Sequence, residues 1–232
     1  MQKMLGLLGG MSWESTLPYY RIINQYVKET LGGLHSARLL LHSVDFYDIE
    51  KMQSSGDWEA AADYLSQAAI GLKQAGADAI VICTNTMHKV ADQVEQRCQL
   101  PIIHIADAAA AEIQRQQLAT VALLGTRYTM EQSFYRGRLT ERFGIRVLIP
   151  DPLQRDEINR IIFDELCLGQ IRDESRQVLC RIIADLQQNG AQGVILGCTE
   201  LPLLIRPDDV MIPQLDTTQL HALAAARFAL GQ

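Results

Sequence analysis

Short runs of hydrophobic residues alternate along the chain with longer segments in which hydrophobic residues recur every three or four positions. The short runs are rich in Leu, Ile and Val, as expected of strands that are buried on both faces. They predict strands at Met4–Leu8, Leu39–Val44, Ala79–Cys83, Ile102–Ile105, Val121–Leu124, Arg146–Ile149, Gly193–Cys198 and Met211–Leu215. The longer segments predict helices at Thr16–Leu31, Trp58–Gln74, Met87–Gln96, Glu131–Arg142, Asp156–Leu168, Glu174–Asn189 and Leu220–Leu230. This alternation is typical of α/β proteins with parallel sheets.

One series of motifs occurs twice. Residues 6–10 (GLLGG) match 122–126 (ALLGT), residues 76–84 match 190–199 with one extra residue, and 100–103 match 211–214 loosely. Three matches in the same order at nearly one spacing indicate an internal repeat. We therefore expect two pseudo-symmetric, doubly wound α/β domains with mainly parallel sheets and the active site in the cleft between them. The expected domains are 1–104 plus 213–232, and 105–212, so that the last helix returns to the first domain.

Composition and charge exclude several function classes. A net charge of −6 with scattered basic residues argues against a nucleic-acid partner. No apolar run reaches the length of a membrane span, so we expect no membrane partner. Five cysteines at irregular spacing do not form a disulfide framework and favour a cytoplasmic location. The cysteines and histidines also lack metal-ligand spacing, so no metal is expected.

The repeat places Cys83 and Cys198 at the ends of matching strands. In open α/β sheets, ligands bind beyond the carboxyl ends of the strands, so both thiols are expected to reach one cleft. By itself, a cysteine at a strand end is as often a packing residue as part of a site. Three cysteines have no matching partner and are interpreted as packing residues: Cys98, Cys167 and Cys180. The matched pair is interpreted as a site. A helix start after each cysteine is expected to favour the thiolate.

Two thiols on opposite sides of a substrate suit inversion of an amino-acid α-carbon. One group removes the α-proton while the other delivers a proton to the opposite face. Backbone N–H groups of residues 84, 85, 199 and 200, with the hydroxyls of Thr84, Thr199 and Thr126, are candidate donors to the substrate carboxylate. The alternative route through pyridoxal phosphate needs a suitable lysine, and the chain has only Lys3, Lys28, Lys51, Lys73 and Lys89. We therefore expect no cofactor.

At these motifs the sequence resembles the aspartate/glutamate racemase superfamily, and within it the aspartate racemase branch. The resemblance covers essentially the whole chain and is carried by residues 9–16 (GGMSWEST), 83–88 (CTNTMH), 123–126 (LLGT) and 197–204 (GCTELPLL). It implies a cofactor-free two-base racemase that is usually a homodimer. By this likeness Cys198 takes the proton of the L-enantiomer and Cys83 that of the D-enantiomer. The resemblance also implies substrate contacts at Met11, Gln53, Thr84, Asn85, Thr199 and Glu200.

Two departures bear on the substrate. Glutamate racemases carry His where this chain has Glu200, and well-studied aspartate racemases resemble one another in an Arg near Gln53 and a Lys near residues 165–169, both absent here. A second substrate carboxylate would lose charge-assisted partners. Aspartate, and then glutamate, are the first expected substrates, with a broader amino-acid racemase acting on homoserine or similar as an alternative. Maleate isomerase or arylmalonate decarboxylase chemistry and a non-catalytic small-molecule sensor remain further alternatives.

Overall fold

A computed structural model describes residues 2–232, which divide into two units. The first unit comprises residues up to Ile105 together with Thr218–Gln232, and the second comprises Ala106–Thr217. The expected second crossing at residue 213 is wrong by a few residues, because the last strand of the chain pairs within the second unit.

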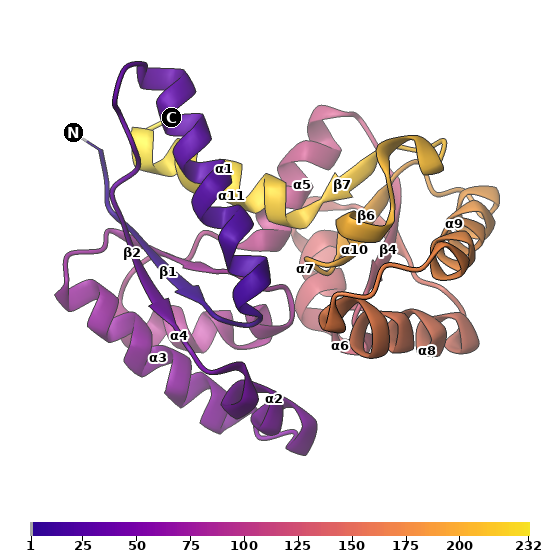
Figure 1. Cartoon of the computed structure of the whole chain (residues 1–232), viewed down its shortest axis with the longest axis horizontal. Coiled ribbons are helices and arrows are strands. Elements are labelled where there is room, and N and C mark those ends of the chain that lie inside the picture. The colour runs from indigo at the N-terminus through magenta and orange to yellow at the C-terminus, as the bar shows by residue number, and fades with distance from the viewer. Residues whose placement is uncertain (1) are drawn as a thin grey trace. The chain divides into compact units, whose positions relative to one another are not determined.

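The first unit contains a three-stranded parallel sheet in the order β2-β1-β3, formed by β1 (Leu5–Gly9), β2 (Leu39–Ser43) and β3 (Ala79–Ile82). Its helices are α1 (Trp13–Leu31), α2 (Phe46–Ser55), α3 (Trp58–Gln74), α4 (Ala91–Cys98) and α11 (Thr217–Leu230), with a 3-10 helix η1 (Thr86–Val90) before α4. They cover both faces of the sheet (Figure 1), as in a doubly wound fold.

The alternation of side chains along the strands divides the core of the first unit in two. Leu8, Ile80 and Ile82 pack with α3 and α4 on one face. Leu5, Leu7 and Val81 face the other way and pack with α1 and with the alanines of α11 (Ala222, Ala225, Ala226 and Ala229). The final helix therefore completes the core of the unit in which the chain begins.

The second unit contains a four-stranded parallel sheet in the order β5-β4-β6-β7. Its strands are β4 (Thr120–Gly125), β5 (Arg146–Leu148), β6 (Val194–Gly197) and β7 (Gln214–Asp216). The helices are α5 (Ile105–Arg115), α6 (Arg127–Glu131), α7 (Ser133–Phe143), α8 (Pro152–Arg160), α9 (Asp173–Gln188) and α10 (Leu201–Leu204), with the shorter turns η2 (Ile161–Glu165), η3 (Leu166–Leu168) and η4 (Pro207–Asp209). Residues of α8, η2 and α9 pack against β4 and β6.

The two sheets share one topology, as the internal repeat predicts. In the first, β1 lies between β2 and β3 with Leu8 opposite Ile82; in the second, β4 lies between β5 and β6 with Leu124 opposite Leu196. These pairs are the ones that the sequence repeat aligns. The predicted α/β class with parallel sheets is confirmed.

Several predicted elements differ from the structure. The strand expected at 102–105 is a single bridge between Ile80 and Ile102, and a helix begins at Ile105. The helix expected at 131–142 is broken at Gln132, whose backbone is extended. The helix expected at 156–168 begins earlier, at a capping box formed by Asp151, and then loosens into the π-helical turn η2 and the 3-10 turn η3. Helices α2, α5 and α10 were not predicted.

Candidate functional site

Cys83 follows β3 directly, at the carboxyl end of the first sheet. Its backbone N–H donates to the Leu8 carbonyl at 2.9 Å, which holds it beside the end of β1. The side chain is fully buried among the residues that pack α1 and α11 on the sheet. Its Sγ lies 3.7 Å from the Val81 carbonyl oxygen.

The turn after β1 lies at the same end of this sheet because β1 and β3 are parallel neighbours. Gly10 adopts a φ of +90°, and a Cβ atom there would lie 2.3 Å from the Val44 carbonyl oxygen. Only glycine suits such a turn. Met11 follows it and is buried.

Gln53 reaches residues 83–88, called here the Cys83 segment, from α2. Its side-chain amide donates to the Met87 sulfur at 2.9 Å, and the side chain is buried. Asn85 is also buried, whereas Thr84 is half-buried. The structure thus brings Met11, Gln53 and the Cys83 segment to one end of the first unit.

A cluster of buried histidines lies behind the Cys83 segment, and sequence reasoning missed it. His88 Nδ1 lies 2.7 Å from the Thr84 carbonyl oxygen, and the Ile105 N–H donates to His88 Nε2 at 3.2 Å. Because a carbonyl only accepts, Nδ1 carries the hydrogen and the ring is neutral. The rings of His104 and His221 lie 4.6 and 5.4 Å from that of His88, centroid to centroid. The only sequence signal was the position of His88 four residues after Thr84, which alone did not indicate burial.

His221 is the deepest member of this cluster. Its Nε2 lies 2.5 Å from the Ile103 carbonyl oxygen, and its Nδ1 lies 2.9 Å from the Tyr19 hydroxyl. The carbonyl requires a hydrogen on Nε2, so Nδ1 accepts from Tyr19. Burial lowers the pKa of His221 to about 4. The ring is therefore neutral and joins α1, α11 and the segment before α5.

Cys198 follows β6 directly in the second unit. It lies one residue further past the matched pair Leu124–Leu196 than Cys83 lies past Leu8–Ile82. It is buried, and its thiol donates to the Glu200 carboxylate at 3.0 Å. The Thr199 hydroxyl donates to the same carboxylate oxygen at 2.6 Å. Thr126 follows the neighbouring strand β4, where it caps α6, and is buried as well. The second unit thus brings Thr126, Cys198, Thr199 and Glu200 to one sheet end.

The expectation that both cysteines favour the thiolate is wrong for this structure. Burial raises the pKa of the Cys83 thiol. Burial also raises the pKa of Cys198, and the charge of Glu200 raises it further. Cys83 is followed by the 3-10 helix η1, which runs directly into α4, and Cys198 is followed by the four-residue helix α10. Both groups rest as thiols.

Cys167 was interpreted as a packing residue, but it is exposed. Cys167 belongs to η3, which packs against α10, the helix that follows Cys198.

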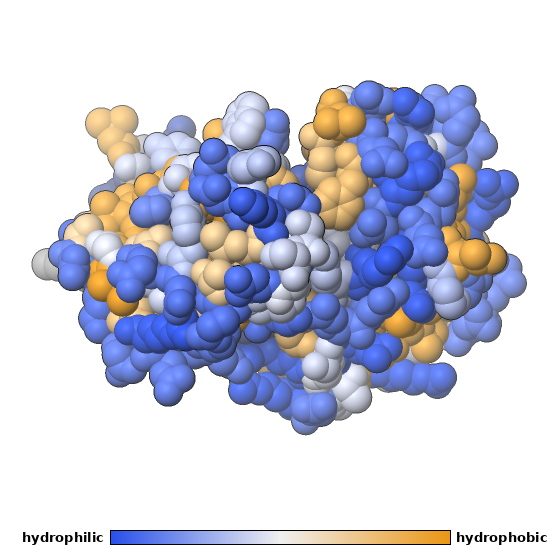
Figure 2. All heavy atoms as spheres, turned by 90° about the horizontal axis from the view of Figure 1, so that it is seen from below, coloured by the Kyte–Doolittle hydropathy of each residue, from blue (hydrophilic) through white to orange (hydrophobic). Residues whose placement is uncertain are grey.

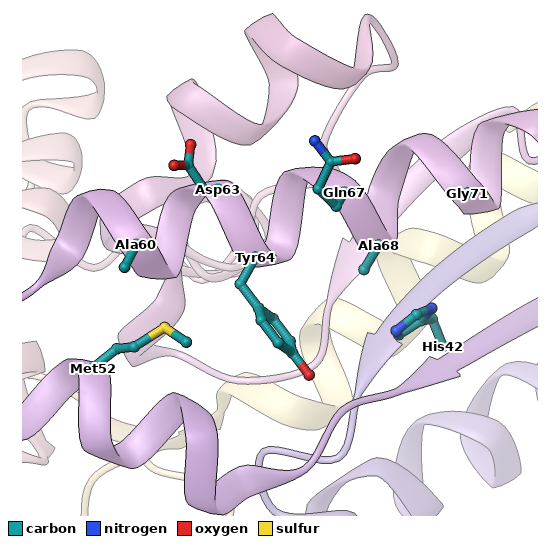
Figure 3. Close-up of a pocket in the computed structure, with 8 residues that line it drawn as sticks. All are labelled: His42, Met52, Ala60, Asp63, Tyr64, Gln67, Ala68 and Gly71. Carbon is teal, nitrogen blue, oxygen red and sulfur yellow. The ribbon is translucent and has the colours of Figure 1, made fainter.

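A separate hollow of about 660 Å³ lies in the first unit between α3, α2 and β2. Met52, Tyr64 and His42 point into it (Figure 3). None of the predicted site residues lines it, and Asp63 at its rim is paired with Arg97. The hydrophobic residues visible in Figure 2 form small patches separated by hydrophilic ones.

Residues 2–232 contain no group of three or more His, Cys, Asp or Glu side chains arranged to hold a metal ion. No helix in that same range is long and apolar enough to cross a membrane.

Comparisons with known proteins cover nearly the whole chain. A broad specificity amino-acid racemase, RacX of Bacillus subtilis (strain 168), is 24% identical over 221 residues, or 93% of each chain. The solved structure of a candidate Asp/Glu racemase from Yersinia pestis is 60% identical, with a TM-score of 0.94 over 98% of this chain and 99% of that one. An aspartate racemase homologue from Pyrococcus horikoshii OT3 is 36% identical, with a TM-score of 0.85 over 99% and 100%. The family model for Asp/Glu/hydantoin racemases matches residues 8–225, and the chain belongs to this racemase family.

Proposed function

We propose that this protein is a cofactor-independent amino-acid racemase that uses Cys83 and Cys198 as its two acid/base groups, with aspartate as the first expected substrate. The observation that carries the proposal is that each thiol comes directly after the strand that pairs with the central β1 or β4, at the carboxyl end of its sheet. One thiol must lose its proton for the reaction to begin, because a thiolate is the base.

The surrounding residues support an amino-acid substrate. We propose that the carboxylate binds to N–H and hydroxyl groups around Thr84, Asn85, Thr126 and Thr199. The pairing of Gln53 with Met87 places a neutral amide, rather than a cation, beside the Cys83 segment. A neutral amide can pair with a carboxylate, a hydroxyl or another amide, so we propose a specificity broader than aspartate alone.

The test is incubation with L-aspartate in deuterated water without pyridoxal phosphate, followed by optical rotation and α-deuteration. Glutamate, homoserine and asparagine complete the panel, and maleate is included for the isomerase alternative. Loss of optical rotation with one deuterium gained is the expected result. If no amino acid in the panel exchanges its α-proton, the racemase proposal is wrong.

The cysteine roles need separate variants. Cys83→Ser and Cys198→Ser are each expected to abolish inversion in both directions, because each removes one of the two proton carriers. Cys180→Ser, in α9, is the matched control and is expected to retain activity. Full activity in either Cys83→Ser or Cys198→Ser would exclude the two-thiol mechanism. Light scattering of the purified protein tests the expected homodimer.

A further inference from the structure

The loops that carry the two thiols differ in charge at the second residue after the cysteine. Cys83 is followed by Thr84 and Asn85, whereas Cys198 is followed by Thr199 and Glu200. A neutral amide in the first unit thus corresponds to a carboxylate in the second. The repeat extends as far as the Cys-Thr pair in both units, so this difference in charge lies at the first position beyond the shared residues.

Glu200 is built into the Cys198 loop. Its side chain is buried, and its Oε2 accepts both the Cys198 thiol at 3.0 Å and the Thr199 hydroxyl at 2.6 Å. Two donors on one oxygen fix the carboxylate, and the carboxylate in turn fixes the direction of the S–H bond. The polar contact described for Cys83 is only the Val81 carbonyl oxygen, at 3.7 Å.

A carboxylate beside a thiol favours the protonated form, because ionisation would place two negative charges side by side in a buried site. From this contact we infer that Glu200 is a positioning residue that holds Cys198 as the proton donor of the resting pair, which leaves Cys83 as the group that ionises first. The inference rests on the proposed racemase function. In the first turnover of a D-amino acid, the Cys83 thiolate takes the α-hydrogen, and the Cys198 thiol delivers its proton to the opposite face. Cys83 then carries the hydrogen and Cys198 the negative charge, so atoms and charge balance.

The experiment measures Cys198 without any substrate. The protein is alkylated with iodoacetamide across a series of pH values, and the modified Cys198 peptide is quantified by mass spectrometry. In Glu200→Gln the charge is removed, and we expect Cys198 to react about tenfold faster near neutral pH, which corresponds to about one pKa unit. Glu200→Asp keeps the charge and is expected to react more like the parent chain.

Glu165→Gln is the matched control, because Glu165 is another buried carboxylate of the second unit. It accepts from Ser175 at 2.6 Å and from Arg160 at 2.8 Å rather than from a thiol. We expect its Cys198 reaction rate to match that of the parent chain. Thiolate absorbance, taken as the difference from Cys198→Ser, gives the same comparison if the reagent reaches the buried thiol slowly.

Equal Cys198 reactivity and absorbance in the parent chain and Glu200→Gln at every pH would overturn the inference, as would an equal increase in Glu165→Gln. Catalysis gives a second readout. The equilibrium constant between enantiomers is one, so Glu200→Gln must change kcat/KM equally in both directions, and we expect its pH optimum to move to lower pH. A protein that fails to racemise but shows the Cys198 effect would refute the proposed function and leave the contact of Glu200 with Cys198 established.

Discussion

His221 provides the sharpest test of the structure because its neutral form is tied to the fold. The folded protein lowers its pKa from 6.5 to about 4, whereas the unfolded chain binds a proton at the ordinary pKa. Below pH 6.5 the unfolded chain therefore binds a proton at His221, whereas the folded protein does not. The stabilisation that comes from neutral His221 is fully present above pH 6.5. It is lost as the pH falls toward 4, by about 3 kcal/mol in total. About 2 kcal/mol of this loss falls between pH 7 and pH 5.

Urea unfolding followed by tryptophan fluorescence measures this loss in the right part of the molecule. The two tryptophans, Trp13 and Trp58, both belong to the first unit, as does His221. His221→Gln removes the titrating group, so its loss of stability between pH 7 and pH 5 is expected to be about 2 kcal/mol smaller than that of the parent chain. The same carboxylates titrate in both proteins, so their effect on the free energy of unfolding cancels when the two proteins are compared. An identical acid-induced loss in the two proteins would refute the reasoning.

Three further predictions concern stability. Gly10→Ala is expected to cost more than about 3 kcal/mol or to prevent folding, because the added Cβ would meet the Val44 carbonyl and alanine disfavours positive φ; Gly137→Ala, inside α7, is the control and is expected to stabilise by about 0.5–1 kcal/mol in thermal unfolding. Equal effects at the two sites would contradict this account. Asp151→Ala removes the N-cap of α8 and should cost about 1 kcal/mol in urea unfolding; no measurable loss would show that the cap is dispensable. Tyr19→Phe removes the hydrogen bond to His221 and should cost about 1–3 kcal/mol, because it leaves a buried acceptor unpaired; an unchanged midpoint by tryptophan fluorescence would argue against that bond.

The sequence was most informative where hydrophobic pattern and burial agree. Strands such as Leu5–Gly9 and Val194–Gly197 are buried at every position, so their short apolar runs identified them directly. The segment around Ile102 has the same composition but forms one bridge only. There the chain leaves the first unit, and Ile105 begins α5. A hydrophobic run does not reveal such a change of unit.

The electrostatics of the candidate site could not be predicted from the sequence. The pattern places Cys83 and Cys198 at strand ends and predicts a helix start after each, which favours thiolates. The burial of both thiols and the direction of the Glu200 side chain depend on the folded loops. The histidine cluster escaped notice for a similar reason, because His88, His104 and His221 are far apart in sequence.

The discontinuous first unit has a consequence for synthesis on the ribosome. The second unit is continuous and contains all four of its strands by Asp216. The first unit lacks α11 until Thr218–Gln232 have been made, and until then Leu5, Leu7 and Val81 lack the alanines that cover them. The inserted unit can therefore fold while its host is still open. Chaperones would meet the exposed apolar face of the host during this interval, and its burial must wait until residues 218–232 have emerged from the ribosome.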